Sequence, residues 1–144
     1  MSKSTVFAAV DAEYDRLTEL ARDIWERPEL GLNEEYAATL LQGVLSKAGF
    51  AIDSEVGGMP TAFVATYGTE DPTIGILGEY DALPALSQAV STDRESLEAG
   101  SPGHGCGHNL FGVAGVGAAL ALKEAIDAGE IDGTVRFYGT PAER

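Results

Sequence analysis

The spacing of apolar residues predicts a helix at the start of the chain. Between Val6 and Ile24, apolar side chains recur every three or four positions, which places them on one face of an amphipathic helix. Pro28 predicts that this helix ends near Arg27, because the residue before a proline is disfavoured in the α region. The members of the apolar face are Val6, Phe7, Val10, Tyr14, Leu17, Ala21 and Ile24.

A second helix is predicted to start at Asn33. Asparagine is a good N-cap residue, and the two glutamates that follow it lie where the helix dipole favours negative charge. Lys47 and Gly49 supply the cation and the glycine that are typical of a helix C-terminus. The apolar face of this helix is predicted to be Ala37, Leu40, Leu41, Val44 and Leu45.

The remaining pattern predicts strands, a long connection and a third helix. Residues 73–78 form a short continuous apolar run, which is typical of a strand buried on both faces. The stretch from Pro84 to Asn109 has little periodicity, and loops of that length inside a compact domain are usually functional. These elements predict a mixed α/β fold, with a partly parallel sheet flanked by helices. The other predicted strands are 51–56, 61–67 and 134–138, and the third helix is 110–128.

Composition and charge narrow the range of partners. The chain has 144 residues, about one domain, and its 23 acidic against 9 basic residues give a formal charge of −14. Such a charge repels phosphate backbones and anionic membrane surfaces, so we expect no nucleic acid and no membrane as partner. No apolar run reaches the roughly 18 residues that a transmembrane helix needs. The single cysteine cannot form an internal disulfide and favours a cytoplasmic location.

The clearest chemical signal is a cluster of metal-binding residue types in the segment 103–109. The only cysteine and both histidines of the chain lie there within five residues, separated by glycines. Thiolate sulfur and imidazole nitrogen together suit zinc and similar divalent ions, so Cys106 and His108 are candidate metal ligands. The role of His104 is left open between a further ligand, a residue that supports a ligand, and an ordinary loop residue.

Carboxylates follow two of the predicted strands. Glu79 and Asp81 come directly after the run 73–78, and Glu143 comes after the strand 134–138. Carboxylates are costly in a core but useful at the carboxyl edge of an α/β sheet, where binding sites gather. We therefore expect Asp81 to orient a ligand or tune a base, and Glu143 to be a general base beside a metal-activated water.

Three glycines near the start of the third predicted helix superficially match a nucleotide-binding loop. Gly112, Gly115 and Gly117 do not follow a strand, and their spacing differs from the dinucleotide-binding pattern. They are therefore predicted to allow close helix packing. A small flavodoxin-like domain that binds phosphate through these glycines is a less favoured alternative, and the acidic charge also counts against it.

Four segments of the chain, in this order, resemble the zinc-dependent amidohydrolases that include aminoacylases and carboxypeptidases. The resemblance covers nearly the whole chain and is strongest to the branch that contains the B subunit of p-aminobenzoyl-glutamate hydrolase. It implies that residues 1–144 are the N-terminal portion of a metallopeptidase catalytic domain, without the inserted dimerisation domain. The segments are 25–32, 77–88, 103–109 and 133–143.

The resemblance also implies an activity and a role for each candidate residue. The reaction would be metal-dependent hydrolysis of the amide bond of N-acyl amino acids such as p-aminobenzoyl-glutamate, or of dipeptide-like substrates, with Zn²⁺ or Mn²⁺. Cys106 and His108 would bind the metal, and Glu143 would activate water. Asp81 takes the place of the carboxylate that follows a ligand histidine in many relatives, and Glu79 stands where that histidine would be. In the full-length family, a homo- or hetero-oligomer is also implied.

Two departures from the family pattern define the alternative. Arg144 occupies the position of a second, metal-binding glutamate, and a cation there repels a divalent ion. Relatives are also much longer, and Cys106 and His108 are one ligand short of the usual three at a catalytic zinc. The alternative is a truncated, non-catalytic chain that binds metal weakly or needs a complementing chain. Whether this chain is an enzyme by itself is left open, and we expect it to be inactive alone.

Overall fold

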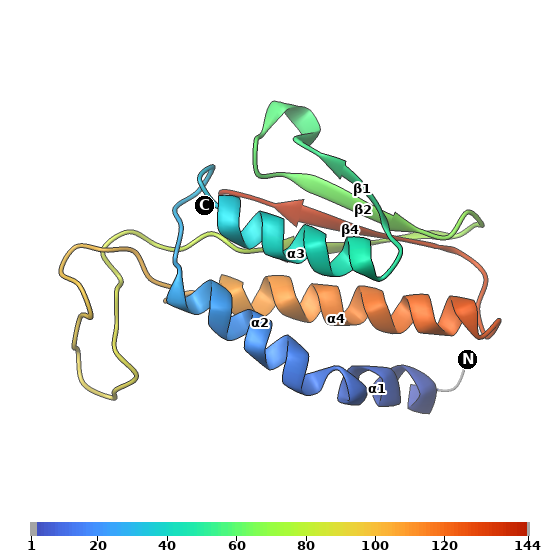
Figure 1. The fold of residues 1–144 in the computed structure, drawn as a ribbon, viewed down its shortest axis with the longest axis horizontal. Coiled ribbons are helices and arrows are strands. Elements are labelled where there is room, and N and C mark those ends of the chain that lie inside the picture. Colours follow the sequence, from blue (N-terminus) through green and yellow to red (C-terminus); the bar gives the residue numbers. More distant parts are fainter. Residues whose placement is uncertain (1–2, 144) are drawn as a thin grey trace.

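The computed structural model describes residues 3–143 (Figure 1). Arg144, and with it the predicted repulsion of a metal ion, lies outside the described residues. The described helices are α1 (Lys3–Ala12), α2 (Tyr14–Glu26), α3 (Glu35–Lys47) and α4 (His108–Asp127), with a short 3-10 turn, η1 (Val56–Gly58). The described strands are β1 (Ala51–Ser54), β2 (Phe63–Tyr67), β3 (Thr73–Glu79) and β4 (Thr134–Thr140).

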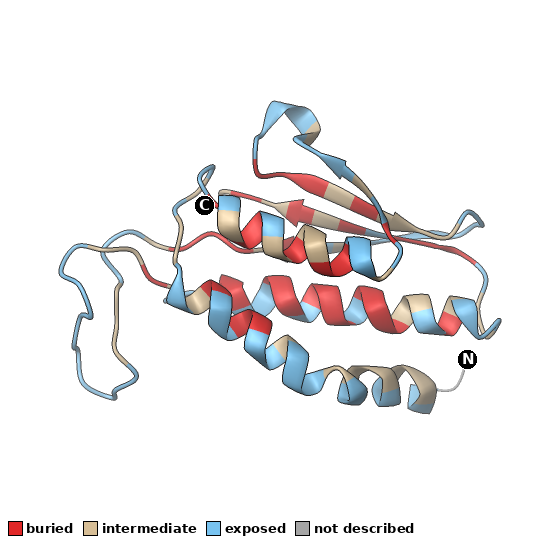
Figure 2. Cartoon of the chain, in the orientation of Figure 1, coloured by how far each residue is buried: buried red, intermediate tan, exposed pale blue. Residues whose placement is uncertain are grey.

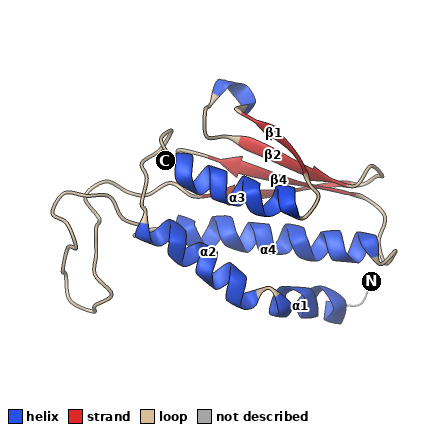
Figure 3. Cartoon of the chain, in the orientation of Figure 1, coloured by secondary structure: helices blue, strands red, loops and turns tan. Residues whose placement is uncertain are grey.

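The described strands form one mixed sheet in the order β1–β2–β4–β3. β1 pairs antiparallel with β2, and β2 pairs antiparallel with β4, whereas β3 and β4 run parallel. α4 lies in the crossover between these two parallel strands, which is the connection that a parallel pair requires. The helices gather on one side of the sheet (Figures 1 and 3). The predicted mixed α/β fold with a partly parallel sheet is confirmed.

α4 is the central helix of the core, and its buried side chains contact the sheet and α2 (Figure 2). Its glycines permit this close approach. A Cβ at Gly112 would lie 2.4 Å from the carbonyl oxygen of Glu79, and one at Gly117 would lie 2.8 Å from the Leu17 side chain. The predicted packing role of these glycines is confirmed. By length and composition α4 could cross a membrane, but 56% of its most apolar window is buried, as expected of a core helix.

The first predicted helix is two helices in the structure, which corrects the prediction. α1 and α2 meet at Glu13, whose N–H donates to the carbonyl of Val10 at 3.1 Å, a three-residue step in place of the four-residue step of an α-helix. The apolar stripe runs through this break without interruption, so periodicity alone could not reveal it. The predicted end near Arg27 is confirmed, because Arg27 is the C-cap of α2.

The start of α3 also differs from its prediction. The helix begins at Glu35, and the Asn33 side chain donates to the Gly31 carbonyl instead of capping the helix. The first helical N–H groups are bound by the Glu29 carboxylate, which comes from the loop before the helix. A carboxylate at this place also complements the positive end of the helix dipole.

β3 is not buried on both faces, contrary to its prediction. It lies at the edge of the described sheet and pairs only with β4 there. Ile74 is 52% exposed and Leu77 is 61% exposed. The continuous apolar run indicated a strand correctly but not its place in the sheet, since the number of strand neighbours depends on long-range pairing.

Candidate metal centre

The carboxyl ends of β3 and β4 lie side by side and define the candidate site. In the parallel register, Glu79 at the end of β3 is opposite Thr140 at the end of β4. The Thr140 hydroxyl also donates to the Gly78 carbonyl at 3.2 Å. The backbone segments that carry Asp81 and Glu143 therefore leave the sheet at the same edge.

α4 begins at this edge and brings His108 to the two carboxylates. The residue before it, Gly107, has a φ of 86°, a left-handed conformation that glycine adopts without strain. Nδ1 of His108 lies 2.6 Å from Oδ1 of Asp81, and Nε2 lies 2.9 Å from Oε2 of Glu79. Both ring nitrogens therefore face a carboxylate oxygen at hydrogen-bonding distance.

The two carboxylates differ in burial. The Asp81 side chain is 0% exposed, whereas the Glu79 side chain is 25% exposed. A buried carboxylate that accepts from one ring nitrogen of a histidine fixes the orientation of the ring, and metal-binding histidines commonly have such a partner. Asp81 thus holds the His108 ring from the protein side, and Nε2 of His108 is directed toward the more accessible Glu79.

The other predicted site residues are more exposed. Cys106 is a free, exposed thiol two residues before His108. Glu143 is exposed three residues beyond the end of β4. The structure therefore brings Asp81 and His108 into direct contact, and it leaves Cys106 and Glu143 accessible on segments that end at the same edge.

His104 makes no hydrogen bond to His108 or Asp81 of ordinary geometry. Both of its ring nitrogens are buried and make no hydrogen bond of ordinary geometry within residues 3–143. Burial lowers the pKa of the His104 imidazole, the backbone of Ile24 raises it, and the nearby His108 lowers it. The net shift is downward and favours the neutral ring, and the role of His104 in metal binding stays open.

The donor set fits a divalent metal in kind but falls short in number. The His108 imidazole, the Glu79 carboxylate and the Cys106 thiol are ligand types that zinc accepts, and the first two also suit manganese. In the part of the chain that the structure describes, no group of three or more histidine, cysteine, aspartate or glutamate side chains is placed to hold an ion. A catalytic zinc commonly has three protein ligands, so these residues form one side of a metal centre.

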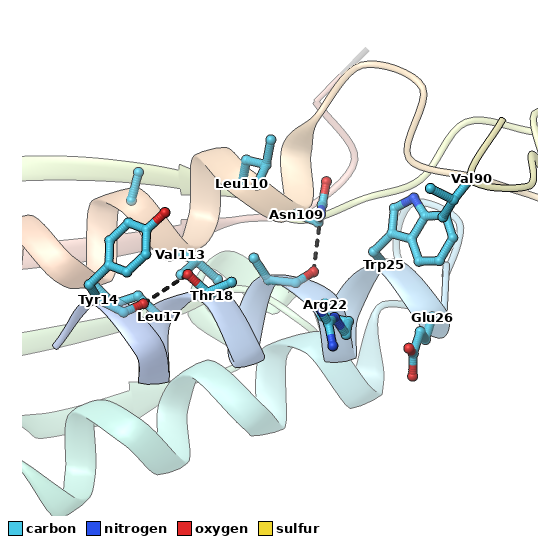
Figure 4. Close-up of a pocket in the computed structure, with 12 residues that line it drawn as sticks. Tyr14, Leu17, Thr18, Arg22, Trp25, Glu26, Val90, Asn109, Leu110 and Val113 are labelled. Atoms are coloured by element: carbon cyan, nitrogen blue, oxygen red, sulfur yellow. Dashed lines mark hydrogen bonds between the residues drawn. The ribbon is translucent and has the colours of Figure 1, made fainter. Parts of the chain in front are cut away.

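A groove between α2 and α4 adjoins the candidate site (Figure 4). Asn109 follows His108 at the start of α4, and its side chain donates to the Ala21 carbonyl of α2 at 3.0 Å. Trp25 and Leu110 line the groove on either side of this bond. Asn109 thus ties the start of α4, and with it His108, to α2. The sequence did not indicate this role of Asn109.

The contacts of the loop between α2 and α3 were not predicted, although residues 25–32 carry part of the family resemblance. The Glu29 carboxylate accepts the N–H of Tyr36 at 2.9 Å and the N–H of Ala37 at 3.0 Å. The carbonyl of Glu29 accepts the N–H of Ala82 at 2.7 Å, directly after Asp81. The sequence signals were that resemblance and a glutamate in a short loop, and neither identifies distant partners.

Known proteins share both this sequence and this fold, although no protein-family model matches the chain. The B subunit of the p-aminobenzoyl-glutamate hydrolase of Escherichia coli is 45% identical over 136 residues, which make up 94% of this chain and 28% of that protein. The Xaa-Arg dipeptidase of Mus musculus is 34% identical over 93% of this chain and 30% of its own length. A crystal structure of a dinuclear metal-binding peptidase from Bacillus subtilis, of the M20 family, is 32% identical with a TM-score of 0.76, over 92% of this chain and 36% of that one.

The chain belongs to this family of amidohydrolases and peptidases. The similarity runs through nearly the whole chain, from the first helices to the last strand, so the predicted family is confirmed. The chain spans 28 to 30% of the length of the two curated relatives.

Proposed function

We propose that this chain carries part of the catalytic centre of a metal-dependent amidohydrolase. The substrate would be a small N-acyl amino acid such as p-aminobenzoyl-glutamate, or a dipeptide-like amide. The observation that carries the proposal is the His108 ring held between Asp81 and Glu79 at the carboxyl edge of a parallel strand pair. The similarity to the Escherichia coli hydrolase supports the substrate class. A cytoplasmic location and a place in the N-terminal portion of a catalytic domain belong to the same proposal.

Each residue has a distinct role in this proposal. Cys106 and His108 bind Zn²⁺ or Mn²⁺, and Asp81 keeps the His108 ring in the binding orientation. Such an ion, when bound, polarises the substrate carbonyl and makes water more acidic. Glu143 accepts the proton of the attacking water as general base. Glu79 is a further carboxylate near Nε2 of His108 and could bind the same ion.

Metal binding has a site-specific test, because Cys106 is the only cysteine of the chain. Zn²⁺ held jointly by Cys106 and His108 should slow alkylation of the thiol by iodoacetamide. The variant His108→Ala should react at the metal-free rate at the same Zn²⁺ concentration, with its fold checked by circular dichroism. Equal protection of both proteins would mean that the thiol binds zinc without His108 and would contradict the proposed pair.

Hydrolysis is measured as release of p-aminobenzoate from p-aminobenzoyl-glutamate with added Zn²⁺ or Mn²⁺. Any turnover by the chain should be removed by a chelator, and Glu143→Gln should lower it by at least about 100-fold, the smaller end of general-base contributions. Glu19→Gln, an exposed change on α2, is the matched control and should leave the rate unchanged. Full turnover in Glu143→Gln would rule out Glu143 as the base.

A second candidate is a non-catalytic chain that binds metal weakly or needs a complementing chain. The observation in its favour is that the described residues bring together fewer than three metal donors. It predicts protection of Cys106 by zinc without release of p-aminobenzoate. The two measurements together therefore separate the two candidates.

A further inference from the structure

A fully buried carboxylate lies at the start of α3, close to the candidate site but outside the residues discussed for metal binding. The Glu34 side chain is 0% exposed and makes no cap to its own helix. Its Oε2 accepts the Thr61 hydroxyl at 2.7 Å, and its Oε1 accepts the N–H of Ala142 at 2.9 Å. Burying a carboxylate is costly unless both oxygens are hydrogen-bonded, and these two bonds meet that need.

The bond to Ala142 acts on the segment that carries Glu143. Ala142 has a φ of 55°, a left-handed conformation that a residue with a side chain seldom adopts. A Cβ at Gly31 would lie 2.9 Å from the Cβ of Ala142, so the loop before α3 packs directly against this turn. In Figure 1 the chain end after β4 indeed lies beside the start of α3. The strained turn is therefore held from two sides, by the Glu34 carboxylate and by the Gly31 backbone.

The other oxygen of Glu34 leads to the end of β3. Thr61, which donates to Glu34, accepts the hydroxyl of Tyr80 at its carbonyl oxygen at 2.5 Å. Tyr80 lies between Glu79 and Asp81 and is fully buried. Burial raises the pKa of the Tyr80 hydroxyl, and the charges of Glu34 and Asp81 raise it further, so the hydroxyl remains a donor. One carboxylate thus connects the two strand ends on which the candidate site is built.

We propose that Glu34 is a positioning residue that fixes where the backbone carrying Glu143 leaves β4, relative to the end of β3 that carries Asp81. The proposal rests on the proposed role of Glu143. Glu34 itself is buried and would not touch the substrate. Its contribution is to hold the turn at Ala142 in one conformation, so that Glu143 emerges at a constant place.

Two substitutions separate the reach of the Glu34 side chain from its charge. Glu34→Gln keeps the length, leaves one oxygen to accept from Ala142, and turns its amide toward the Thr61 hydroxyl, which can then accept. Glu34→Asp keeps the charge but is one methylene too short to bond both partners. Amide hydrogen exchange followed by NMR reports on the Ala142 N–H directly. We expect Glu34→Asp to lower the protection of this amide by at least about tenfold, the lower end for loss of one hydrogen bond to a charged group.

In Glu34→Gln the loss should be smaller, and the Ala142 amide proton should move upfield, because a neutral oxygen replaces a charged acceptor. This shift serves as the readout if Glu34→Asp does not fold. Core amides such as those of Val116 and Phe137 should change less than Ala142 in both variants. Glu35→Asp and Glu35→Gln, one position further along on the exposed side of α3, are the matched controls and should leave Ala142 unchanged.

Three results would overturn the proposal. The first is an Ala142 amide that exchanges freely in the unchanged protein, and the second is an Ala142 amide that neither Glu34 variant affects. The third is an equal loss of protection at Ala142 and throughout the core, which would make Glu34 a general stabiliser. The exchange measurement needs neither metal nor substrate, so absence of hydrolysis would count against the proposed function alone.

Discussion

Replacing Gly112 with alanine should destabilise the protein, whereas the same change at Gly43 should stabilise it. Both glycines lie inside helices, Gly112 in α4 and Gly43 in α3. Alanine is favoured over glycine in a helix interior by about 0.8 to 1 kcal/mol, so this term is equal at the two positions. The surroundings differ. An added Cβ at Gly43 meets no atom within 4 Å, and one at Gly112 would lie 2.4 Å from the carbonyl oxygen of Glu79.

The size of the effect follows from that contact. An ordinary contact of a Cβ begins at 3.4 Å, so at Gly112 a gap of about 1 Å must open. The opposing atom belongs to the backbone of β3, and relief therefore requires the helix and the strand to move apart. Overpacking costs about 1 to 3 kcal/mol, and a backbone neighbour places this case near the upper end. After the helix gain is subtracted, Gly112→Ala should lose about 2 kcal/mol, and Gly43→Ala should gain about 0.5 to 1 kcal/mol.

Urea unfolding followed by circular dichroism measures both changes. A constant m-value would show that the variants differ in stability and not in the surface exposed on unfolding. For a chain of this size, 1 kcal/mol shifts Tm by about 2 to 4 °C, so the two variants should melt at clearly different temperatures. Equal stabilisation by both substitutions would refute the reasoning. In that case helix propensity would dominate, and α4 and β3 would not be in the close contact described.

The remaining predictions concern the loop before α3 and the far end of α4. Glu29→Gln should destabilise the fold by about 1 to 2 kcal/mol in urea unfolding, because the amide keeps one acceptor and turns a donor toward a helix N–H. Glu35→Gln, an exposed change in the first turn of α3, should cost only a few tenths of a kcal/mol. Equal losses of stability in the two variants would argue against capping by Glu29. The hydrogen bonds from Lys123 and then from Tyr67 lower the pKa of the Asp127 carboxyl below its usual 3.8. A depressed carboxyl pKa gives stability that is present above 3.8 and is lost as the pH falls through the folded value. The stability difference between the unchanged protein and Asp127→Asn should therefore vanish in acid, and a difference that persists there would exclude this origin.

Local sequence signals predicted the elements of the fold but not how they are joined. Apolar periodicity and Pro28 located the end of α2 at Arg27, because both signals act within one helical turn. The break at Glu13 was not predicted, since the apolar stripe on both sides of it faces the same helix, α4. Asn33 carried a strong local preference for the N-cap, and the Glu29 carboxylate took that role from outside the helix. A propensity scale describes each residue by itself. It does not include a capping group that the fold brings from another segment.

The candidate site shows the same limit at longer range. The rule that sites gather at the carboxyl ends of parallel strands made Asp81 and Glu143 candidates from the sequence, and their roles stay predictions. The direct contact of Glu79 with Nε2 of His108 could not be predicted, because it depends on how α4 is seated on β3. That seating is in turn set by Gly112, which the sequence assigned to packing alone. The sequence gives the chemical type of each residue, whereas the distances between these residues depend on the fold.

The loop between α2 and α3 connects stability to the site without taking part in its chemistry. Through Glu29 it caps α3 and bonds the segment just after Asp81, and through Glu34 it holds the turn before Glu143. A rigid loop is useful here, because it adds to the Thr140 hydroxyl bond to β3 that joins the two strand ends. A change in this loop should therefore disturb the spacing of the site carboxylates before it unfolds the core. That order of events distinguishes positioning by the loop from ordinary packing. If the loop contributed only packing, the site would be lost only with global unfolding.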